Sequence, residues 1–455
     1  MIRLGIDEII KAVGGICEDI PDSAFASGVS TDSRSLKQGE LFIPIEGERF
    51  DGHDYIFEAL EKGACCALSH RIPEGRKGVI YVKDTKKALL DLALYYRSLF
   101  NVKVVGVTGS VGKTTTKEMI ASVLSEKYNV LKNEGNLNNE IGLPKTIFEL
   151  NHEHEVAVLE MGMNHFNEIR NLAYASRPDI GVLTNIGVSH MENLGSREGI
   201  LRAKSEIADF MDENSSLVLN ADDDIMKKGA FKQGVKKYWY GVLEKTGIYA
   251  KDIKPSGLSG ISAVICFSGG VEKEVLIPVP GNHMVYNALA AAKTGELLGL
   301  SPEEIIKGIS GFKSQKMRMD IIHAQNGINI INDVYNANPV SMKAALDVLA
   351  TVEGKRVAVM GDMFELGEES RAMHYDTGKY SADKGIDITV AIGAFAEMIY
   401  KGAAENGGKA YYFRTIEDFF KDAKDIVKPQ MTVLVKASRA MGFEEITSRL
   451  QGVIK

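Results

Sequence analysis

The sequence predicts an α/β protein with three domains: a small N-terminal α/β domain, a central parallel-sheet domain and a C-terminal Rossmann-like domain. At 455 residues the chain is longer than one hydrophobic core serves, because single cores stop growing at roughly 250–300 residues. Short β-rich runs alternate with helix-length stretches along most of it, a pattern typical of parallel sheets covered by helices. The region from about 236 to 280 departs from that pattern, and its strand-rich composition favours an antiparallel insertion.

The expected domains are residues 1–84, 85–314 and 315–455. A helical stretch after residue 84 leads into the first strand of the central domain, and a helix from His283 to Leu300 closes that domain. The expected strands share β-branched and apolar residues bounded by Gly, Asn or Asp. They are 39–45, 63–68 and 78–82 in the first domain, 101–107, 156–162, 179–187 and 216–222 in the second, and 327–336, 356–362, 388–393, 410–413 and 432–438 in the third.

The composition is that of an ordinary globular protein, with 45% apolar and 25% charged residues. A net charge of −7 and a pI of about 5.8 argue against a general nucleic-acid binder but not against phosphorylated small molecules. The first 15 residues are typical of an amphipathic surface helix rather than a signal peptide, and no later stretch suits a membrane span. The four cysteines lack metal-ligand spacing, which favours buried thiols in a reducing compartment. We therefore expect a cytoplasmic protein without membrane insertion.

The strongest local motif is VVGVTGSVGKTTTKEMI, residues 104–120, in which a β-branched strand leads through a glycine loop into a helix. In such a motif the loop N–H groups and the helix N-terminus hold phosphates, the lysine neutralises them and a hydroxyl binds Mg²⁺. The motif predicts a P-loop ATPase-like central domain, although Val107 stands where the strict pattern has glycine. An ordinary strand-to-helix turn is the alternative. The residues concerned are Gly109, Ser110, Val111 and Gly112 in the loop, Lys113 for the charge, and Thr114 or Thr115 for the hydroxyl.

Two further strand ends carry candidate side chains. Glu160 ends an apolar strand, at the edge where ligands sit in an open parallel sheet, and its carboxylate suits Mg²⁺. A helix cap or a solvated strand-end acid explains Glu160 equally well. His190 follows the next expected strand, which favours a metal or phosphate role over a structural one. Lys204, on the helix that follows, has the spacing of an ordinary solvated helix lysine.

Polar residues in three later stretches are candidate nucleotide contacts. His283 and Asn287 lie four residues apart at a helix start, where Asn287 could equally be a surface residue. Arg318 follows the expected domain boundary, where it could bind a phosphate or form a surface salt bridge. Asp333 and Asn336 lie in a strand-end loop, with a plain turn as the alternative.

Taken together, these stretches resemble the Mur ligases, in the family's order and across nearly the whole chain. No single stretch would suffice, but the set is specific. The chain departs from the family pattern at Asn332, where an aspartate is common, and at Ala437, where glycine is common. Further stretches that carry the resemblance, and within it the likeness to the ligases that add a dipeptide, are STDSR (30–34), GELFIPIEGERFDGHDYI (39–56), GNLNNEIGLP (135–144), VYNANPVSM (334–342), GDMFELGEES (361–370) and VKASRAMGFE (435–444).

The resemblance implies an ATP-dependent amide ligase that adds D-alanyl-D-alanine to UDP-N-acetylmuramoyl-tripeptide through an acyl phosphate. The products would be the pentapeptide precursor of peptidoglycan, ADP and phosphate. The N-terminal domain would bind the UDP-sugar, the central domain ATP, and the C-terminal domain would close over both. Mg²⁺, expected as two ions, completes the implied cofactors. The two substrates are the implied partners, without nucleic acid, and we expect a monomer.

The resemblance also assigns roles by motif position. Lys113 would contact the β- and γ-phosphates and Arg318 the γ-phosphate. Asn287, Asp333 and Asn336 would contact the nucleoside. The metal-site residues would be Thr114, Thr115, Glu160, His190 and Lys204, the last matching a lysine that is carbamylated in many Mur ligases. The residues expected near the UDP-linked substrate are Ser30, Thr31, Asp32, Ser33, Arg34, Asp51, Gly52, His53, Asn136, Asn138 and Asn139.

Three alternatives were weighed against this function. The nearest is a sibling Mur or folate-type ligase that adds a single amino acid. Folate-type ligases are not expected to carry the stretches at 30–34 and 39–56, and Mur ligases that add a single amino acid lack the YNANP signature within 334–342. A P-loop nucleotide switch is disfavoured because no base-reading N-K-x-D motif occurs and the third domain would have no use. A scaffolding protein with a vestigial loop is disfavoured because the candidate site residues are intact.

Overall fold

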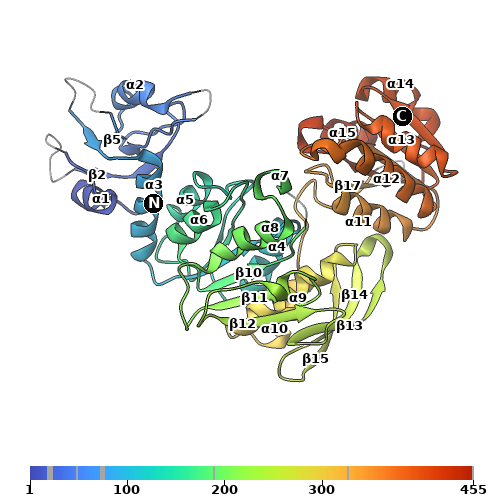
Figure 1. Cartoon of the computed structure of the whole chain (residues 1–455), viewed down its shortest axis with the longest axis horizontal. Helices are drawn as coiled ribbons and strands as arrows, with labels where there is room; N and C mark the ends of the chain where they lie inside the picture. Colours follow the sequence, from blue (N-terminus) through green and yellow to red (C-terminus); the bar gives the residue numbers. More distant parts are fainter. Residues whose placement is uncertain (18–23, 48–49, 72–76, 188–189, 325–326, 453–455) are drawn as a thin grey trace. The chain divides into compact units, whose positions relative to one another are not determined.

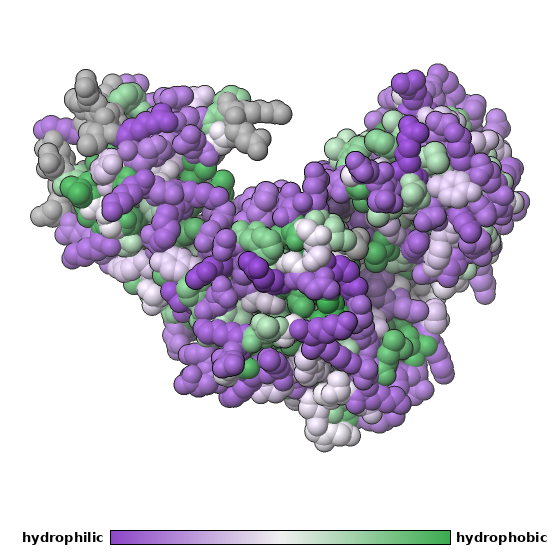
Figure 2. All heavy atoms as spheres, viewed as in Figure 1, coloured by the Kyte–Doolittle hydropathy of each residue, from purple (hydrophilic) through white to green (hydrophobic). Residues whose placement is uncertain are grey.

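The computed structural model describes residues 1–17, 24–47, 50–71, 77–187, 190–324 and 327–452. By their internal contacts they fall into two compact units, Met1–Trp239 and Tyr240–Lys455 (Figure 1). The expected three-domain boundaries stay a prediction. Polar side chains cover most of the visible surface, and apolar ones form scattered patches (Figure 2). Among the described residues, no helix combines the length and apolar composition needed to cross a membrane.

The first unit begins with a small parallel sheet in the order β3-β4-β5-β6 and a short antiparallel pair, β1 and β2. Helix α1 buries Ile6, Ile9 and Val13, as expected of an amphipathic helix, and Gly14 ends it in the left-handed conformation with φ 60°. The expected strands 39–45 and 78–82 contain β4 and β6, and the expected strand 63–68 overlaps β5, which ends at Ser69. The elements are β1 Leu4–Gly5, α1 Ile6–Val13, β2 Phe25–Ala26, β3 Gly28–Ser30, β4 Glu40–Phe42, η1 Gly52–Tyr55, α2 Ile56–Glu61, β5 Cys66–Ser69 and β6 Val79–Tyr81.

The rest of the first unit contains a parallel sheet in the order β8-β9-β7-β10-β11. Thr108 of β7 pairs with Leu183 of β10, and Val107 pairs with Glu160 of β9, so the loops after these strands leave one edge of the sheet. The elements are α3 Thr85–Ser98, β7 Lys103–Thr108, α4 Lys113–Leu124, β8 Val130–Lys132, α5 Gly142–Ile147, β9 Val156–Glu160, α6 Glu168–Ser176, β10 Ile180–Leu183, α7 Met191–Leu194, α8 Arg197–Ser205, η2 Glu206–Ala208, β11 Ser216–Asn220 and η3 Met226–Lys228. Strand β8 was not expected from the sequence.

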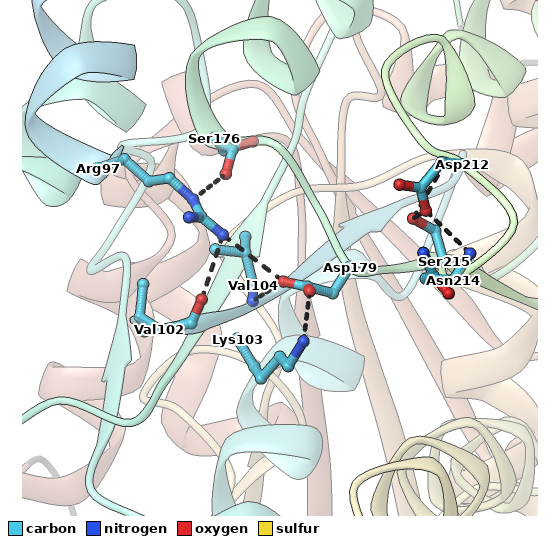
Figure 3. A network of polar contacts seen from close by, with 9 residues as sticks. All are labelled: Arg97, Val102, Lys103, Val104, Ser176, Asp179, Asp212, Asn214 and Ser215. Carbon is cyan, nitrogen blue, oxygen red and sulfur yellow. Dashed lines mark hydrogen bonds and ion pairs between the residues drawn. The ribbon is translucent and has the colours of Figure 1, made fainter. Parts of the chain in front are cut away.

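The opposite edge of this sheet is fixed by a polar network around Asp179 (Figure 3). Its carboxylate pairs with Lys103 Nζ at 2.8 Å and accepts the N–H of Val104 at 2.9 Å. Arg97, at the end of α3, donates to the Ser176 carbonyl at 3.1 Å, and burial lowers the pKa of Arg97. These contacts join the amino ends of β7 and β10 to the helices, so they hold the sheet on the side away from the glycine loop.

The boundary between the two units falls within β12, between Trp239 and Tyr240, and the strand-rich region continues into the second unit. Strands β13, β14 and β15 are antiparallel, as expected, whereas β12 pairs with β13 in parallel through Tyr240 and Gly241. Helix α9 begins at His283, as expected, and ends at Leu297. The elements are β12 Lys236–Gly241, β13 Ile248–Pro255, η4 Gly257–Ser259, β14 Ile261–Cys266, β15 Glu272–Ile277, α9 His283–Leu297 and α10 Pro302–Ser310.

The C-terminal sheet has the order β16-β17-β21-β18-β19-β20, parallel except for the edge strand β16. This is the Rossmann-like arrangement that the alternation predicts, with β16 as an addition that the sequence did not predict. The loops after β17, β18, β19 and β21 leave one edge of this sheet. The elements are β16 Asp320–His323, β17 Asn329–Asn332, α11 Pro339–Ala350, β18 Arg356–Gly361, η5 Gly367–Glu369, α12 Ser370–Asp383, β19 Ile388–Ile392, α13 Ala396–Glu405, β20 Ala410–Phe413, α14 Ile416–Ile426, β21 Thr432–Lys436, η6 Arg439–Met441 and α15 Glu444–Gly452.

Candidate active site

The glycine loop between β7 and α4 is shaped by close backbone approach. A Cβ on Gly109 would lie 1.9 Å from Thr184 Oγ1, so only glycine fits there. Gly112 caps α4 with φ 80°, a left-handed conformation that glycine adopts without strain. Helix α4 then begins at Lys113, and its first N–H groups have no partner within the helix. The helix N-terminus is therefore the part of the loop built to receive an anion.

Thr184 and Asn185, which follow β10, hold the loop from the neighbouring strand. The N–H groups of Ser110 and Val111 donate to the backbone carbonyl and the side-chain oxygen of Asn185, each at 3.0 Å. Thr184 Oγ1 donates to the Val111 carbonyl at 2.7 Å. Two of the loop N–H groups expected to bind phosphate are thus used inside the protein. Neither residue was predicted as a site residue from the sequence, although their place after a strand adjacent to β7 was a usable signal.

Two lysines converge on the carbonyl of Gly109. Lys113 Nζ and Lys204 Nζ each donate to this oxygen at 2.9 Å. Lys204 is 1% exposed, so the interpretation from spacing alone, a solvated helix lysine, is wrong: α8 turns this side chain into the protein. Burial, and then the positive charge of Lys113, lowers the pKa of Lys204 well below its ordinary value.

His190 lies close to the same two lysines. It precedes α7 with φ 64°, an uncommon conformation for a residue with a side chain. Burial, and then the charges of Lys204 and Lys113, lowers the pKa of His190 from its ordinary 6.5 to about 4. The imidazole is therefore neutral at neutral pH and has a nitrogen lone pair available to a metal ion.

Glu160 is a buried carboxylate at the carboxyl end of β9, with 2% exposure. Asn133 accepts the Glu160 N–H at 2.8 Å and donates to the Glu160 carbonyl at 3.1 Å. Asn138 donates to Glu160 Oε1 at 2.9 Å. Glu160 Oε2 is buried and has no hydrogen-bond partner among the described residues. A solvated strand-end acid is therefore excluded, and the position of this oxygen suits a cation.

The donor set here fits Mg²⁺ that is shared with phosphates. A buried carboxylate oxygen and a threonine hydroxyl at the start of α4 are oxygen ligands of the kind that Mg²⁺ prefers. Among the described residues, no group of three or more His, Cys, Asp or Glu side chains gathers to hold an ion alone. Mg²⁺ in nucleotide enzymes is commonly held by one or two carboxylates together with substrate phosphates, and this arrangement agrees with that.

The first set of expected substrate residues lies in the N-terminal part. Ser30 ends β3, and Thr31 and Ser33 belong to the turn that follows. Arg34 Nη2 pairs with Asp32 Oδ2 at 2.7 Å, and its hydrogen bonds lower the pKa of Asp32 to about 2. The turn therefore presents an exposed, charged pair.

The second set is the DGH stretch before α2. Asp51 accepts both the backbone N–H and the ring Nδ1 of His53, at 2.9 Å and 2.6 Å, and pairs with Arg71 at 2.7 Å. A Cβ on Gly52 would lie 2.7 Å from the Ile45 nitrogen, which explains the glycine. His53 Nε2 is buried and lacks a partner in the described part of the chain. Within the 39–56 stretch, positions 48–49 lie outside the described residues.

The three expected asparagines lie in the loop before α5. Asn138 supports Glu160, as described above. Asn139 Oδ1 accepts the N–H groups of Ile141 and Gly142, at 3.2 Å and 2.8 Å, and so begins the turn into α5. The Asn136 carbonyl accepts the Asn138 N–H at 2.8 Å. Their role at a substrate stays a prediction.

The remaining candidates lie in the second unit. Asn287 is buried on α9, with Nδ2 3.4 Å from Met284 Sδ. Asp333 follows β17, and its Oδ2 pairs with Lys436 Nζ at 2.6 Å. Lys436 also donates to the Asn336 carbonyl at 2.9 Å. The structure thus brings Asp333 and Asn336 together around one lysine that the sequence analysis did not single out.

Models of three families match the chain in sequence order. They are described as the Mur ligase family catalytic domain, at residues 26–97, the Mur ligase middle domain, at 107–295, and the Mur ligase glutamate ligase domain, at 317–439. Together they cover the glycine loop, Glu160, His190, Lys204 and Arg318.

Characterised relatives match along nearly their whole length. The chain is 39% identical to the UDP-N-acetylmuramoyl-tripeptide–D-alanyl-D-alanine ligase of Bacillus subtilis, covering 99% of both chains. It is 35% identical to the Escherichia coli ligase of the same name, covering 93% of both. Among solved structures, MurF from Acinetobacter baumannii superimposes with a TM-score of 0.92 at 33% identity, over 99% of both chains. MurF ligase from Thermotoga maritima in complex with ADP gives 0.84 at 30% identity, over 93% of this chain and 96% of that one.

Proposed function

The chain belongs to the Mur ligase family of ATP-dependent, peptide-bond-forming enzymes, and we propose that it adds D-alanyl-D-alanine to UDP-N-acetylmuramoyl-tripeptide. The identity to ligases named for this reaction supports the substrates. The structural observation that carries the proposal is the convergence of Lys113 and Lys204 on the Gly109 carbonyl, at the N-terminus of α4. Lys113 and the N-terminus of α4 place positive charge where the phosphates of ATP would lie, and Lys204 lies beside them.

The proposed reaction has two steps. The terminal carboxylate of the tripeptide attacks the γ-phosphorus of ATP, forming an acyl phosphate and releasing ADP. The amine of the dipeptide then attacks the acyl carbon, and phosphate leaves as the amine loses a proton. Both steps concentrate negative charge, so the task of the protein is to position groups and stabilise charge. Lys113 and the α4 N-terminus serve the β- and γ-phosphates, and Arg318 serves the γ-phosphate.

Thr114 or Thr115, Glu160, His190 and Lys204 would hold Mg²⁺, which we propose as two ions. Mg²⁺ would neutralise the phosphates and polarise the phosphorus that is attacked. Because burial lowers the pKa of Lys204, its amine is suited to add CO₂ with loss of a proton, which turns it into a carbamate. The carbamate would then offer an oxygen ligand for Mg²⁺ at the position of the Lys204 amine.

We assign the other candidate residues to the nucleoside of ATP and to the UDP-linked substrate. Asn287, Asp333 and Asn336 would contact adenine and ribose. Residues 30–34 and 51–53 would lie near the uridine nucleotide, and the three asparagines at 136, 138 and 139 would lie near the UDP-linked substrate. We keep residues 1–84, 85–314 and 315–455 as the proposed substrate, ATP and closing domains, and propose a cytoplasmic monomer.

The proposal is tested by phosphate release from ATP and Mg²⁺ in the presence of UDP-N-acetylmuramoyl-tripeptide. We expect release that requires D-alanyl-D-alanine and fails with single amino acids. Release with a single amino acid would move the enzyme to a sibling activity in the same family. Hydrolysis indifferent to both amines would contradict the ligase and favour a nucleotide switch.

A further inference from the structure

Arg318 is held by the extension of a hairpin. Strands β16 and β17 are antiparallel, and Asp320 pairs with Asn332. The segments next to β16 and β17 remain adjacent beyond the last paired residues. The Met319 N–H donates to Asp333 Oδ1 at 3.2 Å, and the Tyr335 N–H donates to the Met317 carbonyl at 3.1 Å. The residues on either side of Arg318 are thus each tied to the loop that follows β17.

The backbone on both sides of Arg318 has an uncommon conformation. Met317 has φ 66° and Met319 has φ 52°, in the left-handed region that residues with side chains rarely adopt. Such a conformation persists only where the surroundings enforce it. The two hydrogen bonds to the β17 loop supply that enforcement, and together they fix the point from which the Arg318 side chain leaves the backbone.

The guanidinium of Arg318 rests on an aromatic ring. Its Cζ lies 3.8 Å from the centre of the Tyr335 ring, a cation–π contact between two half-buried side chains. In the described part of the chain this side chain forms no ion pair or hydrogen bond. Ring stacking uses the flat face of a guanidinium and leaves the N–H groups at its edge for an anion.

A buried lysine anchors the loop that carries Tyr335. Lys436 is 2% exposed, and its amine bridges the Asp333 carboxylate and the Asn336 carbonyl, at 2.6 Å and 2.9 Å. Asp333 and Asn336 flank Tyr335 in the sequence, so the backbone that carries the ring is held in place. An anchored ring can fix the direction of the arginine that lies on it.

We propose that Tyr335 is a positioning residue, whose ring holds the Arg318 guanidinium in the orientation that meets the γ-phosphate of ATP. This inference rests on the proposed function, in which Arg318 contacts that phosphate. ADP lacks the γ-phosphate, so the ring affects ATP binding and leaves ADP binding unchanged. The hydroxyl of Tyr335 has no part in the contact, so phenylalanine replaces tyrosine without loss.

The test is calorimetric titration of the full-length protein with Mg²⁺ and either ADP or an ATP analogue whose β–γ bridging oxygen is a methylene. Tyr335→Leu is expected to weaken analogue binding about fivefold, the factor that corresponds to about 1 kcal/mol, with the ADP Kd unchanged. Tyr335→Met repeats the test with a second side chain that lacks a ring. Tyr335→Phe is expected to match the parent protein.

The control is Phe420→Leu, which removes an equivalent contact at Arg449, whose Cζ lies 3.6 Å from the Phe420 ring centre. It is expected to lower the melting temperature without changing either Kd. Equal weakening of ADP and analogue by Tyr335→Leu, or none, overturns the positioning role. If Arg318→Ala changes the ratio of the two Kd values but Tyr335→Leu does not, only the positioning role fails. If Arg318→Ala leaves the ratio unchanged, the proposed γ-phosphate contact fails and this inference with it.

Discussion

Lys204 in the first unit and Lys436 in the second are both buried lysines near proposed nucleotide contacts, with 1% and 2% exposure. Their partners differ. Lys436 pairs with the Asp333 carboxylate at 2.6 Å, whereas Lys204 meets a neutral carbonyl and has no carboxylate partner among the described residues. Burial opposes a charged amine unless an opposite charge compensates. The pKa of Lys204 is therefore lowered well below its ordinary value, with burial as the first cause.

Burial alone therefore does not define the role of a lysine. Lys436, paired with Asp333, ties β21 to the loop after β17, which is a structural task. Lys204, whose pKa is lowered by burial, has no carboxylate partner among the described residues, which suits it to a chemical task. Exchanging each lysine for methionine, which has a similar length and no charge, should separate the two tasks.

The largest expected effect is on activity. We expect Lys204→Met to lower kcat about 10³-fold, because it removes one of the groups that stabilise charge at the phosphates. Its free energy of unfolding should be unchanged or slightly higher, since an apolar side chain replaces an unpaired buried amine. Phosphate release and urea denaturation measure the two quantities. Full activity in a correctly folded variant would contradict the site assigned to Lys204.

Stability should respond in the opposite way at the second lysine. Lys436→Met leaves the Asp333 carboxylate without its partner and should lower the free energy of unfolding by about 3 kcal/mol. The control is Lys421→Met, which removes an exposed pair with Asp418 of similar length, 2.7 Å, and should cost below about 1 kcal/mol. Equal losses of unfolding free energy in the two variants would show that the buried pair contributes no more to stability than the exposed pair.

A smaller effect is expected where Gly109 passes Thr184. Gly109→Ala places a Cβ 1.9 Å from Thr184 Oγ1, so the loop must shift, and we expect ADP to bind about tenfold more weakly. Adding Thr184→Ala removes that oxygen and should restore part of the affinity. Fluorescence titration with a labelled ADP measures both variants. If the double variant binds no better than the single one, the clash is not the cause.

A further effect is a pH dependence of stability that arises at His190. Its pKa is about 4 in the folded protein and 6.5 ordinarily, so the unfolded chain takes up the proton first as the pH falls. This contribution to stability is complete above about pH 6.5 and is lost as the pH falls through about 4. His190→Gln should flatten the unfolding free energy over that interval, as measured by denaturation at several pH values. An unchanged slope would show that His190 titrates normally.

Much of the fold was predictable because alternation and motifs are local signals. The strands around the glycine loop, the helix that begins at His283 and the C-terminal strands all follow from residue patterns. Strand β16 was missed because it contributes one antiparallel edge partner, and its pairing with β17 depends on contact between separated segments. The sequence also gave no sign that β12 would pair with β13 in parallel.

The site was predictable to the extent that its residues belong to motifs. Glu160 and Lys113 were chosen for their places after a strand and before a helix. The burial of Lys204 could not be predicted, because its neighbour, the Gly109 carbonyl, is 95 residues away in the sequence. Asn185 and Lys436 act through hydrogen bonds of the same non-local kind, at sequence separations of 74 and 103 residues.

The most direct test of the contrast between the two lysines is ¹³C NMR of the protein in buffer with ¹³C-labelled bicarbonate. The buried Lys204 amine, whose pKa is lowered, should add CO₂ and give a carbamate carbonyl resonance in the parent protein. The account predicts that this signal disappears in Lys204→Met and persists in Lys436→Met. A parent protein without the signal, or a Lys204→Met variant that retains it, would contradict the assignment of Lys204 as the reactive, unpaired lysine.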